Sequence, residues 1–499
     1  MPSDSVKHGA PPPLKDKNAS IIVIGAGVFG LSTAVHLAQR GFKNITIFDK
    51  QPYHESRYSY FKGCDAASAD INKIFRSAYG AQAEYQALSL EAFDAWQKWN
   101  AELASDGDAV PAGMTKDDKV FINNGNLSLT DKPVVPDFEL ATVRSMQEAG
   151  HPDSQLITSD ARHVQIAHDR GFGFAIDPFN RQSRGQSHLG VLDTTGGTIL
   201  ADKACSFALH KAERLGVRTI FGARSGLFES FLRSKAGKVM GIRTLDGKHH
   251  HAARVILACG GWTPSLLPSL DSVCETTAGS VVMMKLPPAL TQRYAADRFP
   301  SWQYKMRDGA DGGLYGFPAT ADGFMKIGYR GTKYTNPRVQ VDGLERSVPI
   351  TRYTCPEAVT DQIPAQAMRV LKRFIDDFLP DLPASEVDIA MTRLCWYTDS
   401  WDNHFVVDYV PGYENVMVAT GGSGHAFKFL PNIGEWIADI VEGKGLERQL
   451  VQSWRWRTRP ERGEQVINEL MEGSGGHRAL QRTKMSSPRE LKLVQGANL

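Results

Sequence analysis

The chain has little net charge and few cysteines. Among its 499 residues, Lys and Arg together exceed Asp and Glu by only two, so we expect neither a nucleic acid nor an anionic membrane as a partner. The six cysteines show no C-x-x-C pair and no zinc-ligand spacing. Each is therefore expected to be a reduced, buried apolar group, as in a reducing compartment. This composition predicts an intracellular protein with no metal site.

Neither end of the chain carries a strong targeting signal. The first 19 residues are polar, contain three consecutive prolines and lack the apolar core of a signal peptide, so we predict a flexible arm at 1–19. The last residues, Gly496-Ala497-Asn498-Leu499, resemble the Ser-Lys-Leu type of peroxisomal address, except that Asn replaces Lys. We therefore predict a cytoplasmic or peroxisomal location.

The clearest motif is a strand, a glycine turn, a helix and a second strand near the start of the chain. A short β-branched run predicts a buried parallel strand, and it ends in the G-x-G-x-x-G of Gly25, Gly27 and Gly30. Such glycines allow a sharp bend, a close backbone approach to a pyrophosphate, and packing of the helix on the strand. Asp49 ends the second strand, where a carboxylate can accept hydrogen bonds from a ribose. The motif predicts a dinucleotide site, and its glycines argue against a membrane-spanning helix.

Further patterns predict the other elements. Periodicity and turn residues indicate helices at 84–99, 138–149, 202–215, 367–378 and 433–441, and strands at 217–221, 255–257, 280–286, 313–317, 324–328 and 416–419. We also expect hairpins at 117–130 and around Asp246-Gly247, a mobile loop at 179–197, a helix near 461–471 and a loosely ordered tail. The three histidines at 249–251 alternate sides on a strand, which favours an exposed hairpin over a metal site.

Two cations, Lys73 and Arg76, lie three residues apart in a segment without strong pattern. Taken alone, they are most simply interpreted as solvated surface charges. A second glycine cluster, between Thr420 and Gly434, precedes the last clear helix. It offers backbone N–H groups and a helix N-terminus to another electron-rich part of a ligand.

Five segments, taken in order, carry a resemblance to a known family. They are the opening glycine turn, INKIFRSAYG at 71–80, RVILACGGW at 254–262, RLCWYTDSWDNHFVVD at 393–408 and SGHAFKFLPNIG at 423–434. Together they resemble the flavin-dependent amine oxidases related to monomeric sarcosine oxidase, over roughly residues 20–445. Within these, the chain looks most like the fungal branch of saccharopine oxidases, pipecolate oxidases and fructosyl amino acid oxidases (amadoriases).

The resemblance implies roles for four residues. FAD would be bound covalently through Cys395, and Lys73 would lie beside the flavin N5, where a positive charge favours electron transfer to O2. Arg76 and Lys428 would clamp the carboxylate of the substrate. The backbone near Phe427 and Lys428 would meet the flavin pyrimidine.

Other residues are assigned to the same site. To the cofactor we assign, besides the glycines and Asp49 of the opening motif, Val28, Phe29, Lys50, Ser68, Asn72, Gly260, Trp262 and Gly424. To the substrate we assign Tyr315, Phe317 and Trp401. Fructosyl amino acid oxidases have a glutamate in a segment that matches residues 315–319, whereas this chain has no acid there, which argues against a sugar substrate. Trp401 replaces a proline of the family. A bulky aromatic there would reshape the pocket toward an aromatic or bulkier amine, but taken alone Trp401 is more simply interpreted as a packed loop residue.

The predicted fold class is α/β: a Rossmann-type FAD-binding domain with an interleaved α+β substrate domain whose β-rich sheet covers the flavin. The FAD-binding domain is expected at 20–100, 196–265 and 386–445, the substrate domain at 101–195 and 266–385, and a C-terminal helix and tail at 446–499. The implied enzyme is a monomeric oxidase of the C–N bond in N-alkylated amino acids that reduces O2 to H2O2, in fungal secondary metabolism. Alternatives are a saccharopine or pipecolate oxidase, a fructosyl amino acid oxidase, a flavin hydroxylase, an NAD-linked dehydrogenase and a non-catalytic flavoprotein.

Overall fold

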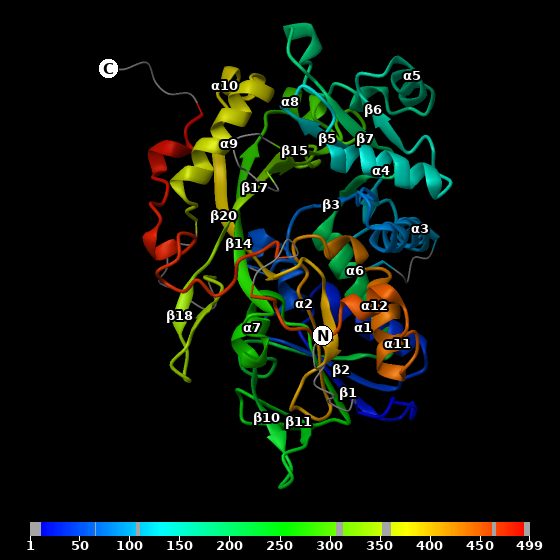
Figure 1. Ribbon diagram of the computed structural model, residues 1–499, viewed down its shortest axis with the longest axis vertical. Coiled ribbons are helices and arrows are strands. Elements are labelled where there is room, and N and C mark those ends of the chain that lie inside the picture. Colours follow the sequence, from blue (N-terminus) through cyan, green and yellow to red (C-terminus); the bar gives the residue numbers. More distant parts are fainter. Residues whose placement is uncertain are drawn as a thin grey trace.

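Two large β-sheets organise the molecule, one in the lower and one in the upper half of Figure 1. The computed structural model describes residues 11–64, 66–105, 110–305, 313–351, 361–461 and 466–493. The predicted α/β class, with a nucleotide-binding sheet and a second β-rich region, is confirmed.

The lower sheet has six strands in the order β21-β22-β13-β1-β2-β9. Its strands are β1 (Ser20–Ile24), β2 (Asn44–Asp49), β9 (Arg218–Phe221), β13 (Arg254–Leu257), β21 (Val406–Tyr409) and β22 (Val416–Thr420). All neighbours are parallel except β21, which pairs antiparallel with β22. The predicted membership of residues 255–257 in the same sheet as the first strand is confirmed.

Each face of this sheet is covered, which explains the unbroken apolar run in β1. Ile21 and Val23 pack into the core beneath the helices, whereas Ile22 and Ile24 pack into a second core on the opposite face. The helices are α1 (Val28–Gln39), α6 (Ala201–Arg214) and α11 (Ile433–Glu442). The opposite face carries a small sheet of β10 (Phe228–Arg233), β11 (Val239–Thr244) and β12 (His249–His251). Strands β11 and β12 form the hairpin predicted around Asp246-Gly247.

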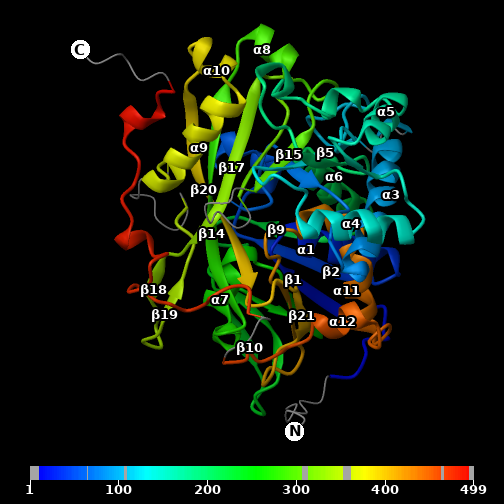
Figure 2. The ribbon, with the colours of Figure 1, turned by 45° about the horizontal axis from the view of Figure 1, so that its top comes forward.

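The upper sheet has eight strands in the order β20-β14-β17-β16-β15-β5-β7-β6. These are β5 (Asn126–Thr130), β6 (Gln155–Ile157), β7 (Gly190–Asp193), β14 (Cys274–Lys285), β15 (Ser301–Lys305), β16 (Leu314–Gly316), β17 (Phe324–Tyr334) and β20 (Ile389–Ser400). Helix α9 (Ala365–Phe378) closes one face over an aromatic cluster that includes Trp302, Phe374 and Phe378. The long strands β14 and β20 descend toward the lower sheet (Figure 2).

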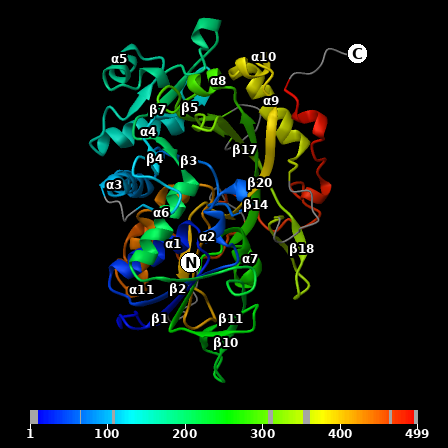
Figure 3. The same cartoon turned by 180° about the vertical axis from the view of Figure 1, so that it is seen from behind.

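A third, three-stranded sheet lies between the two large ones. It consists of β3 (Lys73–Phe75), β4 (Phe121–Ile122) and β8 (Gly197–Ile199), and it is seen in the middle of the molecule in Figure 3. Helix α3 (Ala83–Ser105) packs beside it. The sheet therefore places Lys73 between the two large sheets.

The remaining elements are short or peripheral. The helices are α2 (Tyr53–Ser56), α4 (Asp137–Glu148), α5 (Ala161–Asp169), α7 (Thr263–Leu266), α8 (Pro288–Arg293), α10 (Asp381–Ala384) and α12 (Gln449–Ser453), and β18 (Pro337–Val339) pairs with β19 (Glu345–Ser347). In the described parts of the chain, no helix is long and apolar enough to span a membrane.

The predicted hairpin at 117–130 is wrong. Strands β4 and β5 flank the Asn-Asn-Gly, but β4 pairs with β8, whereas β5 pairs with β7 and β15. The side-chain amide of Asn123 instead donates to the carbonyls of Thr194 and Gly196. The turn thus connects two sheets, and partners distant in sequence determine the pairing.

The predicted mobile loop at 179–197 is also wrong, because the segment includes the buried strand β7 and the first residue of β8. At the N-terminus, residues 11–19 are attached to the domain: Arg254 donates to the carbonyl of Pro12, and the N–H of Leu14 donates to the carbonyl of Val441. Residues 1–10 of the predicted arm lie outside the described residues.

The helix predicted at 461–471 is absent from the described part of that range, 461 and 466–471. The segment that follows is not loose: buried Arg478 pairs with buried Glu275 of β14, and Asn468 donates to the carbonyl of Ser400. These polar contacts have no periodicity that a sequence pattern could reveal. The predicted peroxisomal address lies outside the described residues and stays a prediction.

Candidate active site

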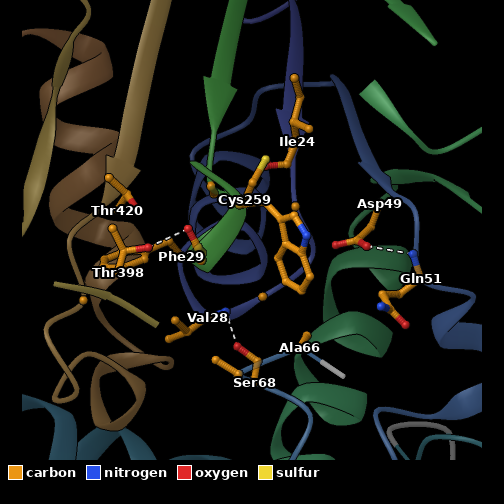
Figure 4. A pocket seen from close by; sticks show the side chains of 18 of the residues that line it. Ile24, Val28, Phe29, Asp49, Gln51, Ala66, Ser68, Cys259, Thr398 and Thr420 are labelled. Carbon is orange, nitrogen blue, oxygen red and sulfur yellow. Dashed lines mark hydrogen bonds between the residues drawn. The ribbon is translucent and has the colours of Figure 1, made fainter. Parts of the chain in front are cut away.

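A deep cavity lies where the parallel strands of the lower sheet end and β20 passes over them. It encloses about 1230 Å³, including the part open to solvent. Its walls come from the opening glycine turn, from the ends of β2, β13 and β22, and from Tyr397 and Thr398 of β20. Figure 4 shows side chains from these separate segments converging on one space. The carboxyl end of a parallel sheet is the usual ligand site of such folds.

The glycine turn has no room for side chains. Gly25 has a φ of +103°, and a Cβ there would lie 2.3 Å from the carbonyl O of Ala258. A Cβ on Gly30 would lie 1.8 Å from the carbonyl O of Gly25. The turn therefore brings bare backbone to the N-terminus of α1, where N–H groups can hold an anion. The side-chain Oγ of Ser68 accepts the N–H of Val28 at 3.1 Å and fixes this approach (Figure 4).

Ser68→Ala is expected to weaken cofactor retention modestly. It leaves the N–H of Val28 without its acceptor, which costs about 0.5–1.5 kcal/mol of binding or folding free energy. Release of FAD under mild denaturation measures the effect in a Cys395→Ala background, which lacks the expected covalent link, with Ser105→Ala, an exposed serine of α3, in the same background as the control. Identical release from both variants would contradict the role of Ser68.

Asp49 lies at the end of β2 as predicted. Its carboxylate accepts the N–H groups of Ala26 and Gln51, both at 2.8 Å, and burial raises its pKa. Both amide atoms of Gln51, the hydroxyl of Thr420 and the indole nitrogen of Trp262 are buried without a hydrogen-bond partner in the described part of the chain. These side chains belong to the cavity wall. A bound dinucleotide would supply the hydrogen-bond partners that they lack.

Beyond the turn, one face of the upper sheet carries a set of polar and ionisable side chains. Residues at alternate positions of a strand share a face, and the register aligns Gly279 of β14 with Cys395 of β20, and Tyr315 of β16 with Gly328 of β17. On this face lie also Lys326, Arg330, Arg393, Tyr397 and Asp399, whereas the intervening residues, such as Met325, Ile327 and Trp396, fill the apolar core. The alternation of side chains along each strand thus puts the polar residues on one face of the sheet and the apolar residues on the other.

Two lysines share one buried carboxylate. The Nζ atoms of Lys73 and Lys326 each lie 2.8 Å from Oδ2 of Asp70. Burial opposes ionisation of all three groups, but the two ammonium groups hold the pKa of Asp70 far below its ordinary value, and Asp70 raises that of Lys73. Burial lowers the pKa of Lys326 to about 8. Below that pH the cluster carries one net positive charge.

Lys326 was not predicted as a site residue, although its place in the sequence gives a signal. It stands at the centre of the apolar run Phe324–Gly328, where a lysine is rarely buried without a function or a partner. The interpretation of Lys73 as a solvated surface charge is wrong, since its side chain is only 18% exposed and lines the cavity.

Cys395 differs from the other cysteines that the structure describes. Its Sγ lies 3.4 Å from a guanidinium nitrogen of Arg393 and 3.9 Å from Nζ of Lys73. Burial by itself would raise the pKa of the Cys395 thiol, but these two cations outweigh it, and the pKa is lowered. Burial raises the pKa of Cys64 and of Cys259 to about 12. Because the thiolate is the nucleophilic form of cysteine, these surroundings favour nucleophilic reactivity at Cys395 more than at Cys64 or Cys259.

Arg76 and Lys428 also lie together. Nζ of Lys428 donates to the backbone carbonyl of Arg76 at 2.9 Å, and both cations lie beside the ring of Tyr79, at 4.5 and 5.7 Å from its centroid. Burial and the charge of Arg76 lower the pKa of Lys428 well below its ordinary value. An anion bound between them would relieve this repulsion.

The other predicted residues are less uniform in position. Tyr315 and Phe317 lie near the lysine cluster, and Nζ of Lys326 is 4.5 Å from the ring centroid of Phe317. Asn72 contributes its carbonyl to Lys326, and Nζ of Lys50 lies 3.9 Å over the ring of Trp262. The cavity wall includes Val28, Phe29, Gly27, Gly260, Gly424 and Phe427. The predicted residues that do not line it are Gly30, Asn72, Arg76, Tyr315, Phe317, Cys395, Trp401 and Lys428. Trp401 is buried next to Arg457, and its carbonyl accepts two backbone N–H groups from the C-terminal segment.

Comparison with known proteins identifies the class. Residues 20–440 match the family described as FAD dependent oxidoreductase, and this chain belongs to that family. It is therefore an FAD-dependent oxidoreductase, and the resemblance to flavin-dependent oxidases predicted from the five segments is confirmed. Among described residues, no cluster of three or more His, Cys, Asp or Glu could hold a metal ion.

Individual oxidases are similar to the chain over most of its length. The chain is 29% identical to an L-saccharopine oxidase of Schizosaccharomyces pombe, over 88% of this chain and 93% of that protein. It is 23% identical to a monomeric sarcosine oxidase of Bacillus sp., over 84% and 92%. Among solved structures, a modified fructosyl peptide oxidase from Aspergillus nidulans is 25% identical, with a TM-score of 0.74, over 94% of this chain and 99% of that one.

Proposed function

We propose that this enzyme oxidises the C–N bond of an N-alkylated amino acid and reduces O2 to H2O2. The observation that carries the proposal is the place of Lys73, which lines the cavity with the glycine turn and lies 3.9 Å from Sγ of Cys395 and 2.8 Å from Asp70. The names of the relatives, which include saccharopine and sarcosine oxidases, agree with this reaction. A saccharopine or pipecolate oxidase remains the alternative within the same chemistry.

FAD, when bound, supplies the acceptor for the electrons of the C–N bond and passes them to O2. We propose that Cys395 holds it covalently through a thioether. Arg393 and Lys73 lie 3.4 and 3.9 Å from the sulfur and lower the pKa of the thiol, which favours the nucleophilic thiolate. Asp49, the glycine turn and Gln51 hold the nucleotide end.

Arg76 and Lys428 bind the carboxylate of the substrate. Because two cations hold this carboxylate, the position of the substrate amine within the site is fixed. The structure offers their proximity and the depressed pKa of Lys428 as support. The lysine cluster around Asp70 supplies positive charge where O2 is reduced, which stabilises developing negative charge in a dry site. The name of one relative, a monomeric sarcosine oxidase, supports the further proposal that the enzyme acts as a monomer.

The test uses the purified yellow protein without oxygen. Secondary amino acids, such as N-methyl and N-carboxyalkyl derivatives, are expected to bleach the flavin absorbance directly, and admitting O2 should restore the colour with one H2O2 per cycle. The tertiary N,N-dialkyl and the N-acyl forms of the same amino acid are the controls. Bleaching that requires a nicotinamide cofactor would favour a flavin hydroxylase, and no bleaching with any amine would favour a non-catalytic flavoprotein.

A further inference from the structure

A buried tyrosine lies beside both cations of the proposed carboxylate clamp, Arg76 and Lys428. Tyr79 is 5% exposed, and its ring centroid lies 4.5 Å from Nζ of Lys428 and 5.7 Å from the guanidinium carbon of Arg76. Among the described residues, neither cation forms an ion pair with a carboxylate; Lys428 donates to the carbonyl of Arg76, and Arg76 to that of Ala78. Because a cation within about 6 Å of an aromatic face is attracted to it, the ring of Tyr79 stabilises both charges.

The hydroxyl of Tyr79 is fixed by His425. Its oxygen lies 2.9 Å from Nδ1 of His425, and Nε2 of the same ring lies 3.1 Å from the carbonyl O of Asn403. Burial lowers the pKa of His425 to about 3, so the imidazole is neutral. A carbonyl can only accept, so Nε2 carries the proton and Nδ1 accepts the hydroxyl of Tyr79.

This hydrogen bond joins the two segments that carry the cations. Tyr79 follows Arg76 by three residues, and His425 precedes Lys428 by three. The two partners are 346 positions apart in the chain. The distance between the segments, and with it the distance between the two cations, therefore depends on the bond between Tyr79 and His425.

Stacked rings hold both partners in place. The ring of Tyr79 stacks on that of Tyr85 at 5.3 Å with an interplanar angle of 15°, and His425 stacks on Phe405 at 4.8 Å and 27°. Neither Tyr79 nor His425 lines the cavity. Any effect of this pair on a bound substrate is therefore transmitted through the two cations.

Resting on the proposed function, we infer that Tyr79 and His425 are positioning residues, which hold Arg76 and Lys428 at the separation that binds one carboxylate. The ring of Tyr79 attracts the two cations to one place, and its hydroxyl ties their segments together. Loss of the hydroxyl loosens the tie, and loss of the ring also removes the attraction.

The test measures two dissociation constants in the holoenzyme. One is that of (methylthio)acetate, a carboxylate that cannot be oxidised to an imine because sulfur replaces the amine, followed by the change in the flavin spectrum. The other is that of an N-methyl amino acid, taken from the concentration dependence of anaerobic bleaching. Tyr79→Phe, which removes only the hydroxyl, is expected to raise both constants about 3–10-fold. Tyr79→Leu, which also removes the ring, should raise them about 10–100-fold.

The rate of bleaching at saturating substrate separates positioning from general disruption of the site. It should change less than about threefold in both variants, because neither residue touches the reacting atoms. His425→Leu should match Tyr79→Phe, and the double variant should be no worse than either, since all three lack the same hydrogen bond. In the Lys428→Met background, Tyr79→Leu should have a further effect of no more than about threefold.

Tyr413→Phe and Tyr413→Leu are the matched controls. They make the same changes at a tyrosine outside the site, whose ring centroid lies 4.6 Å from the guanidinium carbon of Arg233, and they should leave both constants unchanged.

Equal dissociation constants for the wild type and Tyr79→Leu would overturn the inference. So would a full effect of Tyr79→Leu in the Lys428→Met background, or a maximal rate of bleaching that falls in parallel with affinity. If no secondary amine bleaches the flavin while (methylthio)acetate still distinguishes the variants as expected, the proposed oxidase function fails and the positioning role stands. If neither acid binds the wild type, both fail.

Discussion

Replacing either Lys73 or Lys326 with methionine is expected to slow the reaction of the reduced enzyme with O2 by about 10²–10³-fold. Both ammonium groups share the carboxylate of Asp70, so loss of either changes the net charge of the cluster from plus one to zero. Anaerobic reduction by substrate is expected to change far less. Stopped-flow mixing of reduced enzyme with oxygenated buffer measures the effect, and Lys98→Met, an exposed lysine of α3, is the control.

The two lysines should differ in their response to pH. The pKa of Lys326 is about 8, whereas that of Lys73 is raised by Asp70. Lys326 is charged below pH 8 and neutral above, so the rate with O2 should fall as the pH rises through about 8. This fall should vanish in Lys326→Met and persist in Lys73→Met. A profile that is flat in the wild type would contradict this account of the cluster.

Lys428→Met is expected to raise the substrate KM by about 10–100-fold, with a smaller change in the maximal rate of reduction, because it removes one of two cations that hold the carboxylate. Burial and Arg76 keep the pKa of Lys428 low in the free enzyme. A bound carboxylate raises that pKa, so binding takes up a proton, and affinity should fall as the pH rises. The variant should lose this dependence.

The control for this prediction is Lys444→Met, which removes an exposed lysine after α11. Removal of the substrate carboxylate by esterification should weaken binding to the wild type and have little effect on Lys428→Met. If the ester and the acid bind the wild type equally well, the clamp does not exist.

The nucleotide half was predictable because its signals are local. Glycines at fixed spacing, an apolar strand and a terminal acid lie within 30 residues, and the structure reproduces them from β1 to Asp49. The resemblance then pointed to Lys73, which lines the cavity and lies 3.9 Å from Sγ of Cys395, and to Arg76 and Lys428, which contact each other. Elements with a strong period, such as α9 and α11, were predicted to within a few residues.

What escaped prediction depends on pairing across the sequence. The register of β14, β17 and β20 places Lys326, Arg330 and Asp399 on one face, and no local pattern reports a register between strands that are distant in the chain. The same cause explains why β4 and β5 were mistaken for a hairpin. The C-terminal segment is held by single polar contacts such as that of Arg478 with Glu275, which have no period.

The central claim is that one cavity holds FAD through Cys395 beside the lysine cluster. The most direct measurement is denaturation of the purified protein in acid, followed by spectroscopy and intact mass of the polypeptide. The wild type should keep its yellow colour and a mass increased by one FAD, whereas Cys395→Ala should lose both, and Cys64→Ala, at another buried cysteine, should retain them. Colour that separates from the wild-type chain would contradict the covalent link, and colour retained by Cys395→Ala would place that link elsewhere.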